Sequence, residues 1–154
     1  MADIPELIRM RRVMLEDVDG GREVGTEWES PTAEVLKQRL THEDPTTMIM
    51  VVDCPHQPGH IAAFAVGTVD ERLPSHTGGP ANSGYLYSVG TDRGKRGRGY
   101  ATAVVRALLD WFSHQDVRRV SLHGSDNGME VYRKLGFEDN PWPELRFTFT
   151  GPQG

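Results

Sequence analysis

A glycine-rich, basic segment at residues 89–101 constrains the fold most, because it leads directly into a strongly amphipathic stretch. Apolar residues in that stretch recur at spacings of three and four, which predicts a helix with one buried face. These residues are Ala101, Val104, Val105, Leu108, Trp111 and Phe112. The run at 85–89 before the segment predicts a strand. A strand, a glycine-rich loop and a helix in this order indicate an α/β protein whose helix packs against a sheet.

The rest of the chain alternates between strand and helix patterns. Further strands are expected at residues 7–15, 46–52, 60–69 and 119–122, with closing strands from Phe137 onward and at 145–149. Two helices joined near Glu29 are expected within residues 16–41, and another at 127–135 that Gly136 ends. A turn at 54–59 makes two of the strands a hairpin, and a loop is expected at 71–84.

Length and composition narrow the class of protein. A chain of 154 residues predicts one domain, 1–154, with a core that needs no metal or disulfide. The single cysteine, Cys54, excludes an intramolecular disulfide and fits a reducing, cytoplasmic setting. No segment has the length of apolar sequence that a membrane span needs. The net charge of −5 argues against general attraction to nucleic acid or anionic membranes.

The glycine-rich segment has the composition of a local anion site. Gly97 and Gly99 allow main-chain N–H groups to approach a ligand closely, and the following helix begins with unpaired N–H donors. Four cations, Arg93, Lys95, Arg96 and Arg98, lie within six residues of an otherwise acidic chain. We therefore expect a small polyanionic ligand, with a ligand-free exposed turn and a nucleic-acid-binding segment as the alternatives.

Other motifs give weaker indications. A Walker A loop is excluded because Arg96, not Ser or Thr, follows Lys95, and a dinucleotide-binding fingerprint is excluded because Thr102 occupies a glycine or alanine position. Cys54, His56 and His60 are spaced like metal ligands. They lie in a segment rich in proline and glycine and have no fourth ligand at zinc-site spacing, so we interpret them as a turn.

A second motif follows about thirty residues later: Tyr-Arg-Lys-Leu-Gly-Phe at 132–137. The loop and this segment together resemble the GCN5-related N-acetyltransferase (GNAT) family, most strongly over residues 84–139. Gly94 stands where the family usually has Arg or Gln, and Thr91 where it often has Pro. The resemblance implies a single-domain α/β (α+β) fold. Its sheet would be mixed and mostly antiparallel, with six or seven strands, splayed central strands and about four flanking helices.

The resemblance also implies acetyl-CoA as cosubstrate and no metal. Tyr132 would act as general acid toward the departing CoA thiolate, a role that suits a phenol chemically. The cofactor-binding residues implied are Val89, Gly90, Thr91, Lys95, Arg96, Gly97, Arg98, Gly99, Tyr100, Ala101, Thr102 and Ser125. A non-catalytic acyl-CoA-binding module with the same fold is the alternative function.

The acceptor would be a primary amine, on a small molecule or a peptide, that attacks the thioester directly. The candidates for the base are Tyr87, Glu27, Glu29 and His123. The net charge mildly favours a cationic amine. We expect its pocket near Glu27, Trp28, Glu29, the loop at 71–84 and Trp142. The resemblance leaves a homodimer open.

Overall fold

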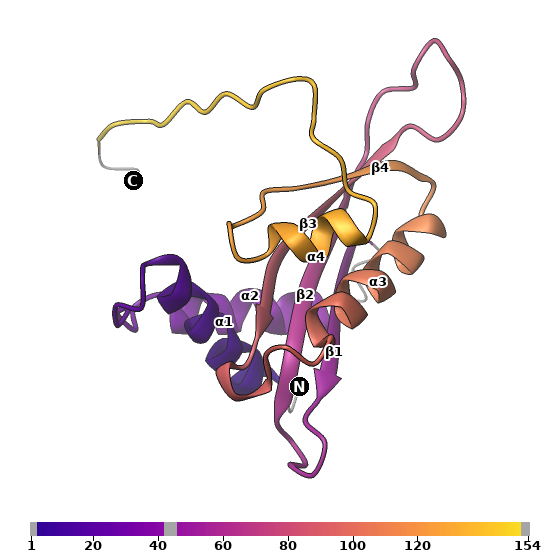
Figure 1. The fold of residues 1–154 in the computed structure, drawn as a ribbon. Coiled ribbons are helices and arrows are strands. Elements are labelled where there is room, and N and C mark those ends of the chain that lie inside the picture. The colour runs from indigo at the N-terminus through magenta and orange to yellow at the C-terminus, as the bar shows by residue number, and fades with distance from the viewer. Residues whose placement is uncertain (1–2, 42–45, 152–154) are drawn as a thin grey trace.

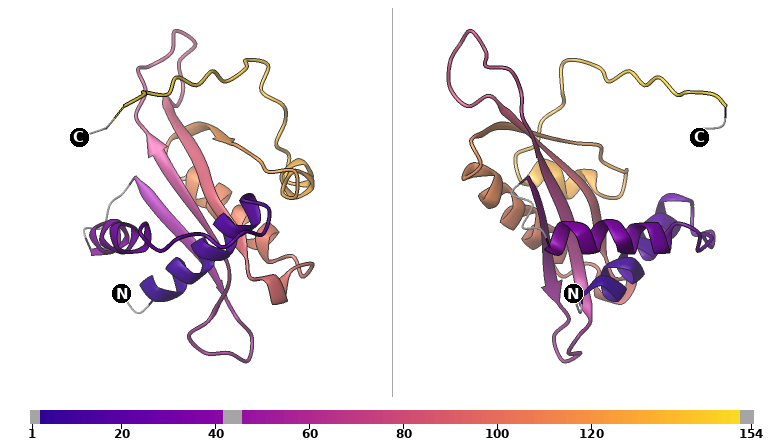
Figure 2. Two further views of the ribbon diagram at one scale, coloured as in Figure 1. Left: turned by 90° about the vertical axis from the view of Figure 1, so that its left-hand side faces the viewer. Right: turned by 180° about the vertical axis from the view of Figure 1, so that it is seen from behind.

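The computed structural model describes residues 3–41 and 46–151, which form a four-stranded sheet in the order β1-β2-β3-β4 with helices on both faces (Figures 1 and 2). β1 to β3 are antiparallel, and β3 pairs with β4 in parallel. The strands are β1 (Thr47–Asp53), β2 (Ile61–Asp70), β3 (Asn82–Thr91) and β4 (Val117–Leu122). The helices are α1 (Ile4–Val18), α2 (Glu29–Thr41), the short 3-10 helix η1 (Arg93–Lys95), α3 (Tyr100–Ser113) and α4 (Met129–Lys134).

Side-chain alternation along β2 divides the core into two layers. Ala63 and Ala65 face the cluster that α3 and α4 contribute to, whereas Phe64 and Val66 face α1. Small residues let α3 approach the sheet closely: a Cβ atom at Gly67 would lie 2.7 Å from Phe112 Cζ. The amphipathic stripe of α3 therefore packs against the sheet as its spacing predicts, which confirms that expectation.

The prediction of a strand at residues 7–15 is wrong, because this segment lies within α1. Leu7 and Met10 are buried against the sheet and Met14 is partly buried, and these positions are three and four residues apart. The polar residues between them suggest the period of a strand, but the buried face follows the period of a helix. Glu6 also forms an ion pair with Arg9, three residues along, at 2.7 Å.

The middle of the chain agrees better with the sequence. The hairpin is confirmed, and the Cys54 N–H closes its turn by donating to the His60 carbonyl at 2.8 Å. Two helices were expected within residues 16–41. The structure has one complete helix there, α2 at 29–41, and residues 16–18 are the last turn of α1. None of the helices in the described ranges is long and apolar enough to cross a membrane.

The C-terminal segment differs most from its prediction. No strand is formed after Phe137 among the described residues, so the sheet has four strands and not six or seven. The segment leads away from the sheet (Figure 1), and Phe147 is 81% exposed. An alternating apolar pattern supplies strand propensity, but a strand forms only where a neighbouring edge provides hydrogen-bond partners.

Candidate functional site

β3 and the edge strand β4 part midway along β3. Their pairing ends at Leu86 and Leu122, while β3 continues to Thr91 alongside β2 alone. A bulge interrupts β3 here: Ser88 has a φ of 52°, and the register with β2 shifts between Phe64 and Val66. One edge of β3 beyond Leu86 therefore has no strand partner among the described residues, and its main-chain groups are available to a ligand.

The glycine-rich loop connects this end of β3 to α3. It passes through η1 and then through Gly97 and Gly99, whose φ angles of 73° and 82° are strained for residues with side chains. No side chain caps α3, and its first helical hydrogen bond is donated by the Ala103 N–H to the Gly99 carbonyl. The free N–H groups at Tyr100, Ala101 and Thr102 and the helix dipole favour an anion at this point.

The four loop cations differ in their partners. Arg93 forms ion pairs with Glu16 at 2.8 Å and Asp17 at 3.4 Å, and the Glu16 hydrogen bond raises the pKa of Arg93. Arg96 is also paired with Asp17. Lys95 and Arg98 form no ion pair in the described part of the chain, so they remain available to a bound anion.

Tyr132 lies on α4 and is 8% exposed. Its ring packs edge-on against Phe137, with ring centroids 5.8 Å apart. Two glycines make room for it: a Cβ atom at Gly128 would lie 2.9 Å from the Tyr132 ring, and one at Gly124 would lie 3.4 Å from it. Burial raises the pKa of Tyr132, so the phenol keeps its proton at neutral pH. Its hydroxyl bonds to no group among the described residues and can therefore donate to a ligand.

Polar side chains also occupy the segment between β4 and α4. His123 directly follows β4, and its Nδ1 is hydrogen-bonded to the Tyr85 hydroxyl on β3, while its Nε2 faces Glu144. Burial, and then the charge of Glu144, raises the pKa of Tyr85. Ser125 is exposed, and its carbonyl accepts a hydrogen bond from the Gly128 N–H at 2.9 Å in the turn before α4.

The residues expected around the acceptor are not gathered together. Glu29 forms an ion pair with Arg12, whose guanidinium lies 5.9 Å from the centre of the Trp28 ring. Glu27 is exposed, and Trp142 is 79% exposed on the C-terminal segment. Among the described residues no three His, Cys, Asp or Glu side chains are grouped so that they could hold a metal ion.

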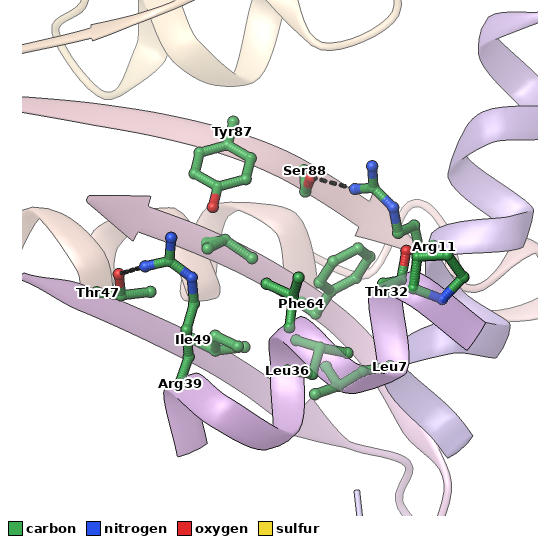
Figure 3. Close-up of a pocket in the computed structure, with 13 residues that line it drawn as sticks. Leu7, Arg11, Thr32, Leu36, Arg39, Thr47, Ile49, Phe64, Tyr87 and Ser88 are labelled. Carbon is green, nitrogen blue, oxygen red and sulfur yellow. Dashed lines mark hydrogen bonds between the residues drawn. The ribbon is translucent and has the colours of Figure 1, made fainter. Parts of the chain in front are cut away.

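A cavity of about 290 Å³ lies instead between α1, α2 and the sheet (Figure 3). Its wall is mostly apolar and includes two guanidinium groups, and no carboxylate lines it in the part of the chain that the structure describes. The lining residues are Leu7, Arg11, Pro31, Thr32, Val35, Leu36, Arg39, Thr47, Ile49, Phe64, Val66, Tyr87 and Ser88. Of the candidates for the base, only Tyr87 lines the cavity. The cavity therefore reaches β3 at its bulge, directly before Val89, Gly90 and Thr91.

Sequence reasoning missed Arg11 as a site residue because it placed residues 7–15 on a strand. Arg11 follows Leu7 by four residues and Met10 by one, so on a helix it borders the buried face. An arginine within an otherwise apolar helical stripe is the signal that could have identified it.

Comparisons with known proteins agree with this geometry. A sequence model of the acetyltransferase (GNAT) family matches residues 11–137. No curated protein matches the chain in sequence.

Three solved structures illustrate the likeness in fold. One is a predicted acetyltransferase from Clostridium acetobutylicum solved with acetyl-CoA, with a TM-score of 0.75, 24% identity, and coverage of 94% of this chain and 90% of that one. The second is a GCN5-related N-acetyltransferase from Ralstonia eutropha, with a TM-score of 0.72 and 21% identity; the match covers 94% of this chain and 92% of that one. The third is glucosamine-6-phosphate N-acetyltransferase from Arabidopsis thaliana, with a TM-score of 0.70 and 17% identity; the match covers 91% of this chain and 87% of that one. With the forked strands, the uncapped helix and a family match over most of its length, the chain belongs to the GNAT family of acetyltransferases.

Proposed function

We propose that this protein transfers the acetyl group of acetyl-CoA to a primary amine by direct attack, within one domain spanning 1–154. The observation that carries the proposal is the fork between β3 and β4, which lies between an uncapped helix N-terminus and a buried phenol. The structure that was solved with acetyl-CoA shares this fold, which supports the same cosubstrate here.

Each part of the cofactor would meet a different part of the fork. The free edge of β3 at Val89, Gly90 and Thr91 would pair with the amides of the pantetheine arm. The pyrophosphate would lie over the loop from Lys95 to Thr102, held by main-chain N–H groups and by the unpaired Lys95 and Arg98. Arg96 could join them only by leaving Asp17. Ser125 would lie at the rim of the site.

Tyr132 would supply the proton that the leaving group needs. The neutral amine nitrogen attacks the thioester carbonyl carbon, the C–S bond breaks, and the departing sulfur takes the phenolic proton. A buried phenol with a raised pKa is protonated when the reaction begins, as a general acid must be. The acetylated nitrogen then loses its extra proton through water to the Tyr132 phenolate, which gives the neutral amide and restores the phenol.

A base must also remove a proton from the ammonium form of the acceptor, because an alkylamine is mostly protonated at neutral pH. The candidates near the fork are His123, which directly follows β4, and Tyr87, which lines the cavity. To accept the proton, His123 would have to release one of its two partners, the Tyr85 hydroxyl at Nδ1 or Glu144 at Nε2.

Tyr132→Phe tests the role of the acid. The ring should still pack against Phe137, so the variant should fold and bind CoA like the parent. Release of CoA thiol from acetyl-CoA across an amine panel should fall by about 10²- to 10⁴-fold in kcat, the usual contribution of a general acid. A Tyr132→Phe variant as active as the parent would remove Tyr132 from this role.

Calorimetry with CoA separates the transferase from a non-catalytic acyl-CoA-binding module. CoA binding with thiol release supports the transferase, and CoA binding without release from any amine favours the module. A protein that binds no CoA would contradict both functions.

A further inference from the structure

Arg11 lines the cavity from α1 and forms no ion pair with a carboxylate among the described residues. Its Nη1 donates a hydrogen bond to the Ser88 hydroxyl at 2.8 Å, across the cavity wall from α1 to the bulge in β3. Its Nε is buried without a hydrogen-bond partner, and it is the one such side-chain atom among the described residues. Figure 3 shows Arg11 at one end of the cavity beside Ser88, and Arg39 near Tyr87 at the other.

Arg9, two residues earlier on the same helix, shows how this protein satisfies an arginine. Arg9 pairs with Glu6 at 2.7 Å and with Asp92 at 3.1 Å, and donates to the Ile61 carbonyl at 3.1 Å. Removing a guanidinium from water is costly unless a carboxylate or similar acceptor replaces the water. Because Nε is buried, a ligand in the cavity would supply the missing carboxylate at the Nη atoms of Arg11.

The cavity limits what that ligand can be. Its wall includes Leu7, Leu36, Ile49, Phe64 and Val66, which favour an apolar body. Its volume of about 290 Å³ lies at the lower end of the range for small-molecule pockets, about 300 to 1,000 Å³. A small molecule therefore fits better than a folded peptide, and a guanidinium beside a hydroxyl suits a carboxylate.

We propose that the acetyl acceptor is a small amino carboxylic acid with an apolar side chain, whose carboxylate binds Arg11. The proposal rests on the proposed function, because the cavity becomes an acceptor site only if acetyl-CoA occupies the neighbouring edge of β3. The apolar side chain lies among the leucine, isoleucine and phenylalanine side chains. The amino group, one carbon from the carboxylate in an α-amino acid, then lies beside the bulge at Ser88, next to the expected thioester.

This acceptor differs from the cationic amine that the net charge favours. Arg11 contributes a guanidinium to the cavity, and no carboxylate lines the cavity among the described residues, although the whole chain carries −5. Local charge governs recognition in a cavity, because neighbouring groups act there with little screening by water.

The test uses pairs of amines that differ only in the carboxylate: leucine with 3-methylbutylamine, and phenylalanine with phenethylamine. Calorimetry measures the binding of each compound to the protein with and without CoA, and thiol release measures transfer from acetyl-CoA. Each amino acid should bind about 10- to 100-fold more tightly than its partner amine, as expected for hydrogen bonds to a charged group. Transfer should follow the same preference.

Variants then assign the preference to Arg11. Arg11→Met should abolish it, and Arg11→Lys should retain part of it, because lysine keeps the charge but loses the planar fork. Arg12→Met is the matched control: it removes the same charge from the adjacent residue, which pairs with Glu29 outside the cavity, and should leave the preference intact. Thermal unfolding checks that all three variants fold.

Two results would overturn the proposal: partner amines that bind as tightly as the amino acids, or a preference that survives Arg11→Met. No measurable binding of either amino acid would do the same. If the carboxylate preference in binding is present but no amine releases thiol, the proposed transferase function fails and the Arg11 site stands.

Discussion

The glycine-rich loop and the cavity beneath α1 both present arginines, but those arginines have different partners. In the loop, Arg93 and Arg96 are exposed and paired with acidic residues at the end of α1. In the cavity, the Ser88 hydroxyl is the one hydrogen-bond partner of Arg11 within residues 3–41 and 46–151, and Nε is buried. A dense run of cations in the sequence is therefore no measure of how many charges a ligand can use.

The arginines of the loop and of the cavity also differ in burial, and burial changes how strongly each interacts with a ligand. Exposed ion pairs contribute little, because water and salt screen both charges and the side chains lose freedom when they pair. A partly buried guanidinium interacts more strongly with whatever replaces its water. We therefore expect one charge in the cavity to affect recognition more than one charge in the loop.

Within the loop, the largest effect should follow the removal of Arg98, which forms no ion pair among the described residues. Arg98→Ala should weaken CoA binding by about 10-fold, the value of one charge-assisted hydrogen bond. Arg93→Ala should have a much smaller effect, because Arg93 is already engaged by Glu16 and Asp17. Calorimetry with CoA at one salt concentration makes the comparison, and equal losses in both variants would contradict it.

Removing the acid that engages the loop should have a smaller and opposite effect. Asp17→Asn releases Arg96 and weakens one of the two ion pairs of Arg93, so CoA should bind a few-fold more tightly. The gain should shrink as salt is added, because Arg96 is exposed and Asp17 is only partly buried. Unchanged or weaker binding in the variant would show that the Asp17 pairs do not compete with the pyrophosphate.

The smallest effect, on thermal stability, is expected when the Glu6–Arg9 ion pair of α1 is broken. Hydrogen bonding from Arg9 holds the pKa of Glu6 below its usual value near 4.5. The Glu6–Arg9 pair therefore stabilises the fold above about pH 4.5, and this stability is lost as the pH falls through the lowered pKa. Glu6→Gln should unfold at a slightly lower temperature at pH 7, with a shallower decline below pH 4.5. This role would be contradicted if the unfolding temperatures of the parent and the variant fell by the same amount between pH 7 and pH 3.

The elements predicted well are those whose pattern lies within one continuous stretch. The run from β3 through the loop into α3 combines a strand pattern, positive-φ glycines and a helical stripe, and each signal is local. α4, with Tyr132 and a left-handed Gly136 at its end, is local in the same sense. The family resemblance rests on these two segments, so the family could be identified before any long-range contact was known.

Elements whose form depends on distant partners were predicted less well. Arg9 and Arg11 read equally well as polar positions of a strand, and only packing against Phe64 and Val66 shows that the segment is a helix. The segment at 145–149 alternates like a strand, but no neighbouring edge pairs with it among the described residues. The pocket expected near Trp28 and Trp142 was placed by composition and not by contacts.

The sequence by itself determined the family, and it predicted an anion site in the loop and Tyr132 as the acid, because glycine conformation, helix periodicity and motif spacing are properties of short segments. Only the tertiary structure decided which cations stay available and which arginine faces the cavity. Those properties depend on burial and pairing between residues far apart in the chain, as in the contact of Arg11 with Ser88, 77 positions away. The free energy of a charged group depends on the groups that replace its water, and those groups are known only once the chain is folded.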